Sequence, residues 1–182
     1  MTIPDFDHNG VLPAHQGDPT EPGQLSPYPV TAVEVVERLG TTPERRATLR
    51  GWLVLRADLR AAGLSGFQWL NGSFAQDVER REGRAPRDID VVSFVRAAAT
   101  GLPDGTAAPA WLYPEASKAA YRVDHYLVNL AGRGEAVVES TRYWSGLFSH
   151  TRDGVWKGML RVELNTPDAD AEALVLLTEA SP

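Results

Sequence analysis

The sequence predicts an α/β (α+β) fold in which helices flank one mixed β-sheet, and three observations predict it. Apolar residues recur at helical spacing between residues 31 and 63. Short runs rich in valine, isoleucine and aromatic residues follow, at the length of strands. Segments with glycine and proline separate these patterns, so helices and strands alternate along the chain. A length of 182 residues suits one domain of ordinary size.

Residues 1–29 are predicted to form an irregular arm ahead of a folded domain over residues 30–182. Six of the thirteen prolines lie in the arm, where they remove backbone donors and fix φ, so neither a helix nor a central strand fits. The arm also carries large apolar and aromatic side chains, which we expect to pack over the domain. These are Ile3, Phe6, Val11, Leu12 and Tyr28.

Two helices are predicted at the start of the domain. The first runs from Thr31 to Leu39, because Thr31 and Glu34 have the spacing of a capping box. The second begins at Thr41 and ends before Gly63. We expect its leucine and tryptophan side chains to be buried and its arginines to face water. The buried set is Leu49, Trp52, Leu53, Leu55 and Leu59, and the wet set is Arg45, Arg46, Arg50, Arg56 and Arg60.

The rest of the domain is predicted to alternate strands with short helices. Strands are expected over 67–70, 88–95, 121–130 and 155–164. Helices are expected over 74–81, 115–120 and 134–148, with a loop over 100–114 and an acidic tail after Pro167. The strand over 88–95 is apolar on both faces, which is typical of a central strand covered on both sides.

The composition excludes several classes of function. The chain has no cysteine, which excludes a disulfide scaffold, a thiolate zinc site and a cysteine nucleophile. A net charge of −6 disfavours binding of a long nucleic acid as the main task. No stretch approaches eighteen apolar residues, and the first residues have no basic start, so we expect a cytoplasmic protein with no membrane partner.

Acidic residues in the predicted strands are the first candidates for chemistry. Asp88 and Asp90 project from the same face of a strand, about 7 Å apart along the chain. Two carboxylates on an apolar strand repel each other and lose hydration, and a divalent cation such as Mg²⁺ removes both costs. The alternative interpretation places Asp88 at the rim and pairs Asp90 with Arg84 or Arg87.

Two further features add to this pair. Gly72 and Ser73 lie where a strand passes into a helix, and backbone amides at such a junction can contact phosphate. Asn-Gly is also an ordinary turn pair, so the turn alone decides nothing. Asp124 lies inside the third apolar run and could complete a cluster of three carboxylates; the alternative is an edge-strand aspartate that faces water.

Taken together, Gly72-Ser73, the run Asp88-Ile89-Asp90-Val91-Val92 and the later Asp124 resemble the nucleotidyltransferase superfamily of the polymerase-β type. The chain as a whole resembles a small bacterial branch of it. The resemblance implies a nucleotidyltransferase-like domain over residues 30–182, in which Gly72 and Ser73 hold the triphosphate. It also implies that Asp88, Asp90 and Asp124 bind Mg²⁺ (or Mn²⁺), with Asp124 favouring loss of the acceptor proton.

The resemblance therefore predicts transfer of a nucleoside monophosphate from a nucleoside triphosphate, such as ATP, to a hydroxyl acceptor. The acceptor stays open: a protein partner, an RNA end or a small alcohol. The alternative is a catalytically idle module of the same fold that binds a nucleotide or a partner protein, for example as an antitoxin or defence-system component. A weaker alternative is a metal-dependent phosphohydrolase.

Several other residues have two interpretations each. Arg84, Arg87, Lys118 and Lys157 are candidate phosphate contacts or solvated charges. Trp111, Trp144 and Trp156 are core residues or stacking platforms for a nucleobase.

Overall fold

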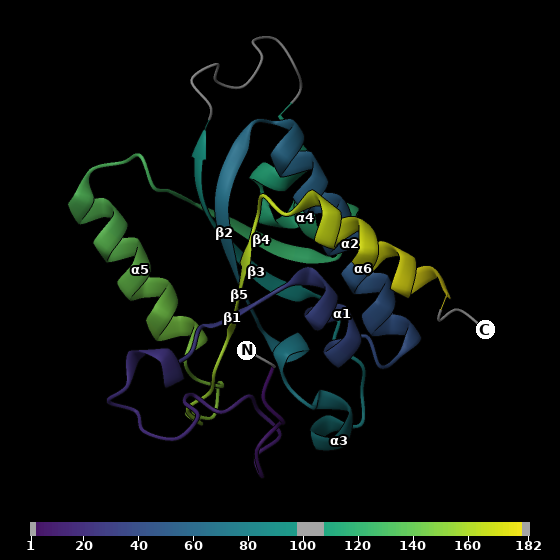
Figure 1. Cartoon of the computed structure of the whole chain (residues 1–182), viewed down its shortest axis with the longest axis vertical. Helices are drawn as coiled ribbons and strands as arrows, with labels where there is room; N and C mark the ends of the chain where they lie inside the picture. Colours follow the sequence, from purple (N-terminus) through teal and green to yellow (C-terminus); the bar gives the residue numbers. More distant parts are fainter. Residues whose placement is uncertain (1–2, 98–107, 180–182) are drawn as a thin grey trace.

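The computed structural model describes residues 3–97 and 108–179 of the chain (Figure 1). The strands in these residues are β1 (Tyr28–Val30), β2 (Leu64–Asn71), β3 (Ile89–Ala97), β4 (Val123–Asn129) and β5 (Leu160–Glu163). They form one mixed sheet in the order β1-β5-β2-β3-β4. β1 pairs with β5 and β3 pairs with β4 in parallel, whereas β2 is antiparallel to both of its neighbours. The α/β class with a mixed sheet is thus confirmed.

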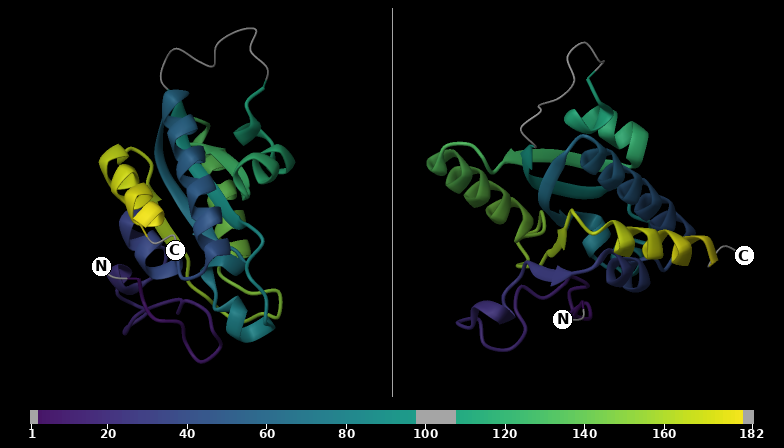
Figure 2. Two further views of the ribbon diagram at one scale, coloured as in Figure 1. Left: turned by 90° about the vertical axis from the view of Figure 1, so that its right-hand side faces the viewer. Right: turned by 45° about the horizontal axis from the view of Figure 1, so that its top comes forward.

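The described ranges contain six α-helices, five of which cover the two faces of the sheet. They are α1 (Ala32–Leu39), α2 (Pro43–Ala61), α3 (Val78–Glu82), α4 (Pro114–Tyr121), α5 (Gly134–Phe148) and α6 (Pro167–Glu179). Three 3₁₀ turns accompany them: η1 (Pro22–Gln24), η2 (Ser73–Ala75) and η3 (Ala110–Leu112). α5 covers one face, while α1, α2, α4 and α6 lie on the other (Figures 1 and 2). None of these helices is both long and apolar enough to cross a membrane.

Alternation along β3 divides the core into two parts. Val91 belongs to the larger apolar cluster, which includes residues of α1, α2 and α6. Val92 and Phe94 face the opposite way and pack in a smaller cluster with Phe148 of α5. Side chains two residues apart share a face, so Asp90 emerges on the same side as Val92, under α5. Both faces of β3 are therefore packed, as predicted for a central strand.

The two predicted N-terminal helices are present, and one of their caps was predicted wrongly. At α1 the capping box is formed: the Glu34 amide donates to Thr31 Oγ1 at 3.2 Å, and the Thr31 amide donates to Glu34 Oε2 at 2.7 Å. At α2 the cap is Thr42, not Thr41, and its hydroxyl oxygen accepts from the Arg45 amide at 3.3 Å. Pro43 then occupies the first turn, where its missing donor costs nothing.

The expectation that the α2 arginines face water was wrong for Arg45 and Arg56, which are 2% and 0% exposed. Arg45 donates to the carbonyl oxygens of Phe74 at 2.8 Å and Gln76 at 2.6 Å, and it pairs with Glu79. A guanidinium has five donors in a rigid fork, so burial is tolerated once they are paired. Arg45 therefore ties η2 and α3, which follow the Gly72 turn, to the core.

Arg56 explains why the acidic tail is a packed helix. Asp170 of α6 is 3% exposed and accepts from Arg56 Nε at 2.9 Å, and it also pairs with Arg60. Ala173 and Leu177 of the same helix enter the larger core cluster. The tail after Pro167 was not predicted as a helix, because its apolar residues alone show little helical contrast.

Two other predicted elements differ from the structure, and a third is only partly described. The strand predicted over 155–164 is only four residues long, as β5. The helix predicted over 74–81 is divided between η2 and α3, because Gln76 is extended (φ −140°, ψ 158°). Of the loop predicted over 100–114, residues 100–107 lie outside the described residues.

The N-terminal arm packs against the sheet and contributes to it. Val11 and Leu12 are fully buried, and the Leu12 carbonyl oxygen accepts from the Gly158 amide at 2.7 Å. At its end, Tyr28 and Pro29 belong to β1, an edge strand, where proline is tolerated. The arm thereby covers the loop that leads into β5.

Candidate active site

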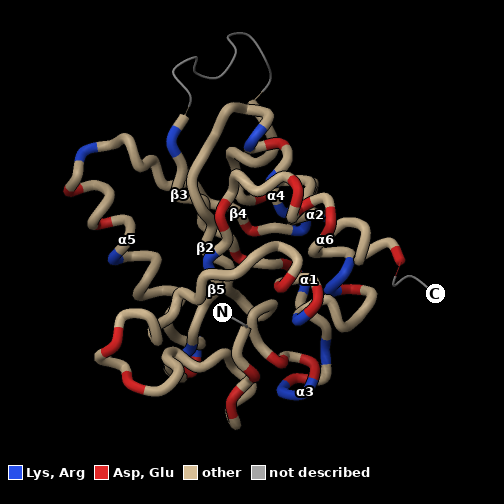
Figure 3. The backbone as a smooth tube through the Cα atoms, viewed as in Figure 1, with Lys and Arg blue, Asp and Glu red and all other residues tan. Residues whose placement is uncertain are grey.

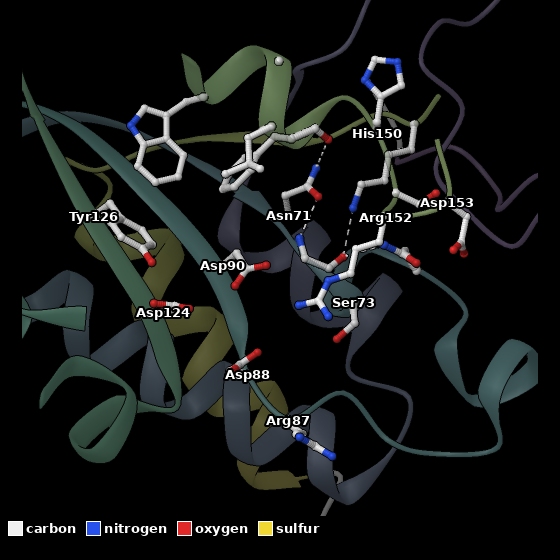
Figure 4. Close-up of a pocket in the computed structure, with 18 of the residues that line it drawn as sticks. Asn71, Ser73, Arg87, Asp88, Asp90, Asp124, Tyr126, His150, Arg152 and Asp153 are labelled. Atoms are coloured by element: carbon white, nitrogen blue, oxygen red, sulfur yellow. Dashed lines mark hydrogen bonds between the residues drawn. The ribbon is translucent and has the colours of Figure 1, made fainter. Parts of the chain in front are cut away.

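A cleft of about 1020 Å³ opens on the α5 side of the sheet, where the end of β2 meets the starts of β3 and β4 (Figure 4). The structure places all five predicted site residues in its lining. They are Gly72, Ser73, Asp88, Asp90 and Asp124. The three carboxylates lie on one side of the cleft, and Ser73 and Arg152 lie on the other (Figure 4).

The pairing of β3 with β4 brings the acids together. Asp90 and Asp124 are direct register partners in this parallel pair, so their side chains leave the sheet on one face. Asp88 precedes Asp90 by two residues and lies at the entrance of β3. All three side chains are partly buried. Acids 34 residues apart in sequence are thus neighbours in the fold.

Asp90 is the acid with the most perturbed environment. Burial, together with the negative charges of Asp88 and Asp124, raises the pKa of Asp90 to about 6. In the described part of the chain, Asp90 forms no ion pair. Placing three carboxylates together therefore costs free energy that a cation would remove.

Lys118 supplies one cation to this cluster. Its Nζ lies 2.9 Å from Asp88 Oδ2 and 3.0 Å from Asp124 Oδ2, so one ammonium bridges two of the three acids. The hydrogen bond to Asp88 and the one to Asp124 raise the pKa of Lys118. The sequence suggested that Lys118 is a phosphate contact or a solvated charge. Its ion pairs with Asp88 and Asp124 were not predicted.

Gly72 is required by the shape of the site. Its φ is +79°, a conformation that favours glycine, and a Cβ atom there would lie 2.8 Å from Asp90 Cγ and closer to a carboxylate oxygen. Asn71 holds this turn: its Oδ1 accepts from the Gly72 amide at 2.7 Å, and its Nδ2 donates to the carbonyl oxygens of Phe148 and Gly158. Asn71 thus joins the turn to α5 and to the loop before β5.

The basic residues proposed as phosphate contacts all line the cleft. Lys157 is only 4% exposed; its Nζ donates to the Gly72 carbonyl oxygen at 3.4 Å, and burial lowers its pKa to about 8. Arg84 pairs with Glu82, while Arg87 and Arg152 are exposed and form no ion pair in the part of the chain that is described. The solvated-charge interpretation is therefore wrong for Lys157.

Aromatic side chains from β4 and α5 form one wall of the cleft. The rings of Tyr126 and Trp144 lie 4.6 Å apart, and Tyr143 beside them is 55% exposed. Of the three ambiguous tryptophans, Trp144 lines the cleft and Trp111 is buried in the core. Trp156 is 51% exposed, outside the residues that line the cleft. A flat ligand could stack on this wall.

Three carboxylates on one face suit Mg²⁺ or Mn²⁺ in kind, because both ions prefer oxygen ligands. Within residues 3–97 and 108–179, however, no three acidic or histidine side chains stand close enough together to hold a metal ion. Lys118 Nζ lies between Asp88 and Asp124, where a shared cation would lie. The three carboxylates therefore fit the ion in donor chemistry, but not in the placement that their side chains have in this structure.

Sequence reasoning missed Asn71 as a positioning residue and Tyr126 as part of the site. Asn71 is 1% exposed and makes three hydrogen bonds, but Asn-Gly in a sequence indicates only a turn. Tyr126 lies two residues after Asp124 and so shares its face, a signal that was available from alternation alone.

The fold and the cleft together define an α/β protein with a mixed sheet and an acidic, aromatic-walled cleft at one end of its central strands. The chain belongs to DUF6932, a family of unknown function, which matches residues 4–163. No curated protein and no solved structure is significantly similar to it.

Proposed function

We propose that the protein is a nucleotidyltransferase, which uses Mg²⁺ (or Mn²⁺) to move a nucleoside monophosphate from a nucleoside triphosphate to a hydroxyl acceptor. The acceptor oxygen bonds to the α-phosphorus, the bond between the α- and β-phosphates breaks, and pyrophosphate leaves. The observation that carries the proposal is the register of Asp90 with Asp124. It brings the third acid to the Asp-x-Asp pair, beside the Gly72 turn, in the order that the resemblance to the superfamily implies. Asp88, Asp90 and Asp124 would hold the cation, whose positive charge would stabilise the reacting phosphate.

The two sides of the cleft then divide the work. On the acidic side, Asp124 also favours loss of the proton from the acceptor hydroxyl. On the other side, Ser73, Lys157 and Arg152 receive the phosphates, with two positive charges to match them. Phosphoryl chemistry depends mainly on such positioning and charge neutralisation.

The aromatic wall and the surface charge limit the substrates. The adjacent rings of Tyr126 and Trp144, tilted by 46° to each other, offer an aromatic surface on which a nucleobase can stack beside the acids. Acidic and basic residues are interspersed along the chain rather than gathered on one basic face (Figure 3). The acceptor is therefore proposed to be a small alcohol or a hydroxyl of a protein partner rather than a long nucleic acid.

A second candidate is a catalytically idle module that binds a nucleotide or a partner protein through the same cleft. The observation that favours it is the Lys118 ammonium, which already neutralises Asp88 and Asp124 without any metal. In that case the acids serve the fold and the binding surface, and no phosphoryl group is transferred.

The test is incubation of the purified protein with Mg²⁺, cell lysate and each triphosphate labelled at the α-phosphate. The proposal expects label to move onto an acceptor with wild type and not with Asp90→Asn. Asp153→Asn removes one exposed charge from the rim of the same cleft and should leave transfer unchanged. Labelled monophosphate released without an acceptor would indicate a phosphohydrolase instead. No product with any triphosphate would favour the idle module.

A further inference from the structure

The cation already inside the acidic cluster has a defined origin in the fold. Lys118 lies on α4, which directly precedes β4, the strand that carries Asp124. Its ammonium makes contacts of 2.9 and 3.0 Å with two acids from two strands. Both are charge-assisted hydrogen bonds, which are stronger than neutral ones. The side chain is 46% exposed, so it has a free path out into the cleft.

α4 is fixed firmly enough to aim this side chain. A Cβ atom at Gly51 of α2 would overlap the Tyr121 carbonyl group, so the two helices approach as closely as backbone allows. The Tyr121 hydroxyl donates to Asp58 Oδ2 at 2.7 Å, which adds a second tie to α2. The next residue, Arg122, has φ of 59° and ends the helix, and its carbonyl oxygen accepts from the Ile89 amide at 3.3 Å. The helix base is thus bound to both α2 and β3.

The ammonium and a divalent cation compete for the same oxygens. A cation shared by Asp88 and Asp124 would lie where Lys118 Nζ lies. The ammonium and the cation cannot occupy one position, and as two positive charges they repel each other strongly at close range. Asp90 is the one acid of the three that Lys118 does not contact within hydrogen-bond distance. An incoming cation can therefore contact Asp90 first, but it gains the other two carboxylates only when the lysine leaves.

We propose that Lys118 is a built-in competitor of the divalent cation: it holds Asp88 and Asp124 together in the metal-free protein and is displaced when the cation binds. This inference rests on the proposed function, because it takes the acidic cluster as a cation site. Lys118 acts as a positioning residue that holds Asp88 and Asp124 together beside Asp90, at the cost of weaker binding of metal alone.

The experiment is titration of the purified protein with Mn²⁺ alone, in which paramagnetic resonance measures the free ion. Lys118→Met should bind Mn²⁺ at least about tenfold more tightly than wild type, because the cation no longer has to break two charge-assisted hydrogen bonds. Lys118→Arg, which keeps the charge, should stay close to wild type. Arg87→Met removes one charge from the same cleft without a contact to the acids, and should change the dissociation constant less than about threefold.

Each outcome decides the question. Equal or weaker binding by Lys118→Met, while wild type binds Mn²⁺, would overturn the role of Lys118 and leave the proposed function standing. Binding by neither protein at several millimolar would remove the cation site, and with it the proposed function. If Arg87→Met gained as much Mn²⁺ affinity as Lys118→Met, the effect would come from the net charge of the cleft rather than from the contacts of Lys118. That result would overturn the proposal. Lys118→Gln repeats the test should Lys118→Met fail to fold, as judged by circular dichroism.

Discussion

Replacing Asp90 with asparagine should stabilise the metal-free protein at neutral pH, although the residue lies at the centre of the proposed site. Its pKa is raised from 3.8 to about 6 by burial and by Asp88 and Asp124. One pKa unit corresponds to about 1.36 kcal/mol, so the charged form costs at most about 3 kcal/mol of folding free energy. Because the side chain keeps some access to water, we expect about half of that or more, about 1.5–3 kcal/mol.

The pH dependence has a defined sign. A carboxyl whose pKa is higher in the folded state contributes stability below its unfolded pKa near 3.8, and this contribution is lost as pH rises to about 6. The asparagine variant has no such loss. Its melting temperature should exceed that of wild type by about 3–12 °C at pH 8, and the difference should shrink toward pH 4.

The assay is a series of thermal melts from pH 4 to pH 8 in the presence of a chelator. Asp153→Asn, an exposed residue of the same cleft, is the control, and its stability should change by less than about 0.5 kcal/mol. The reasoning would be refuted if Asp90→Asn melts at or below the wild-type temperature at pH 8. A gain that does not depend on pH would equally refute it.

Three further substitutions test the structure by urea denaturation, two at the turn beside the site and one in the core on the other face of the sheet. Gly72→Ala should destabilise the fold by about 2–4 kcal/mol, because it forces a positive φ on alanine and places a methyl group against Asp90. Asn71→Ala should cost about 2–3 kcal/mol, since it leaves buried backbone groups without partners; an unchanged midpoint would contradict its role. Asp170→Asn should cost about 3–5 kcal/mol by leaving the Arg56 guanidinium buried with no counter-charge, and a loss under about 1 kcal/mol would be inconsistent with this.

Local rules predicted those parts of the fold that local chemistry decides. The α1 capping box needs only Thr31 and Glu34 at the right spacing, and it is formed. The β3 run is apolar on both faces, and β3 is a central strand. The burial of Arg45 and Arg56 could not be predicted, because the groups that pair with them come from other elements of the fold. α6 was missed for the same reason: Asp170 is an ordinary surface acid until Arg56 is placed beside it.

The candidate site also has parts that the sequence predicts and parts that only the fold reveals. Alternation placed Asp88 and Asp90 on one face, and the register of β3 with β4 then brought in Asp124, which sequence could suggest but not place. Lys118 was read as a phosphate contact or a free charge because nothing in the sequence of α4 indicates how its side chain is aimed. The hydrogen bonds of Asn71 reach the carbonyl oxygens of Phe148 and Gly158 and the amide of Gly72. Only the folded chain brings these three groups together, so sequence alone could not predict them.

The central claim is that the three acids bind a nucleotide together with a divalent cation, and a thermal melt tests it most directly. Wild type is heated with and without Mg²⁺ and each triphosphate, beside Asp88→Asn and Asp124→Asn. At about 100 times the dissociation constant the wild type should gain about 2.7 kcal/mol, which raises its melting temperature by about 5–10 °C. Both variants should lose most of that rise. A wild type that ignores every combination at several millimolar, or variants that rise as much as wild type, would contradict the claim.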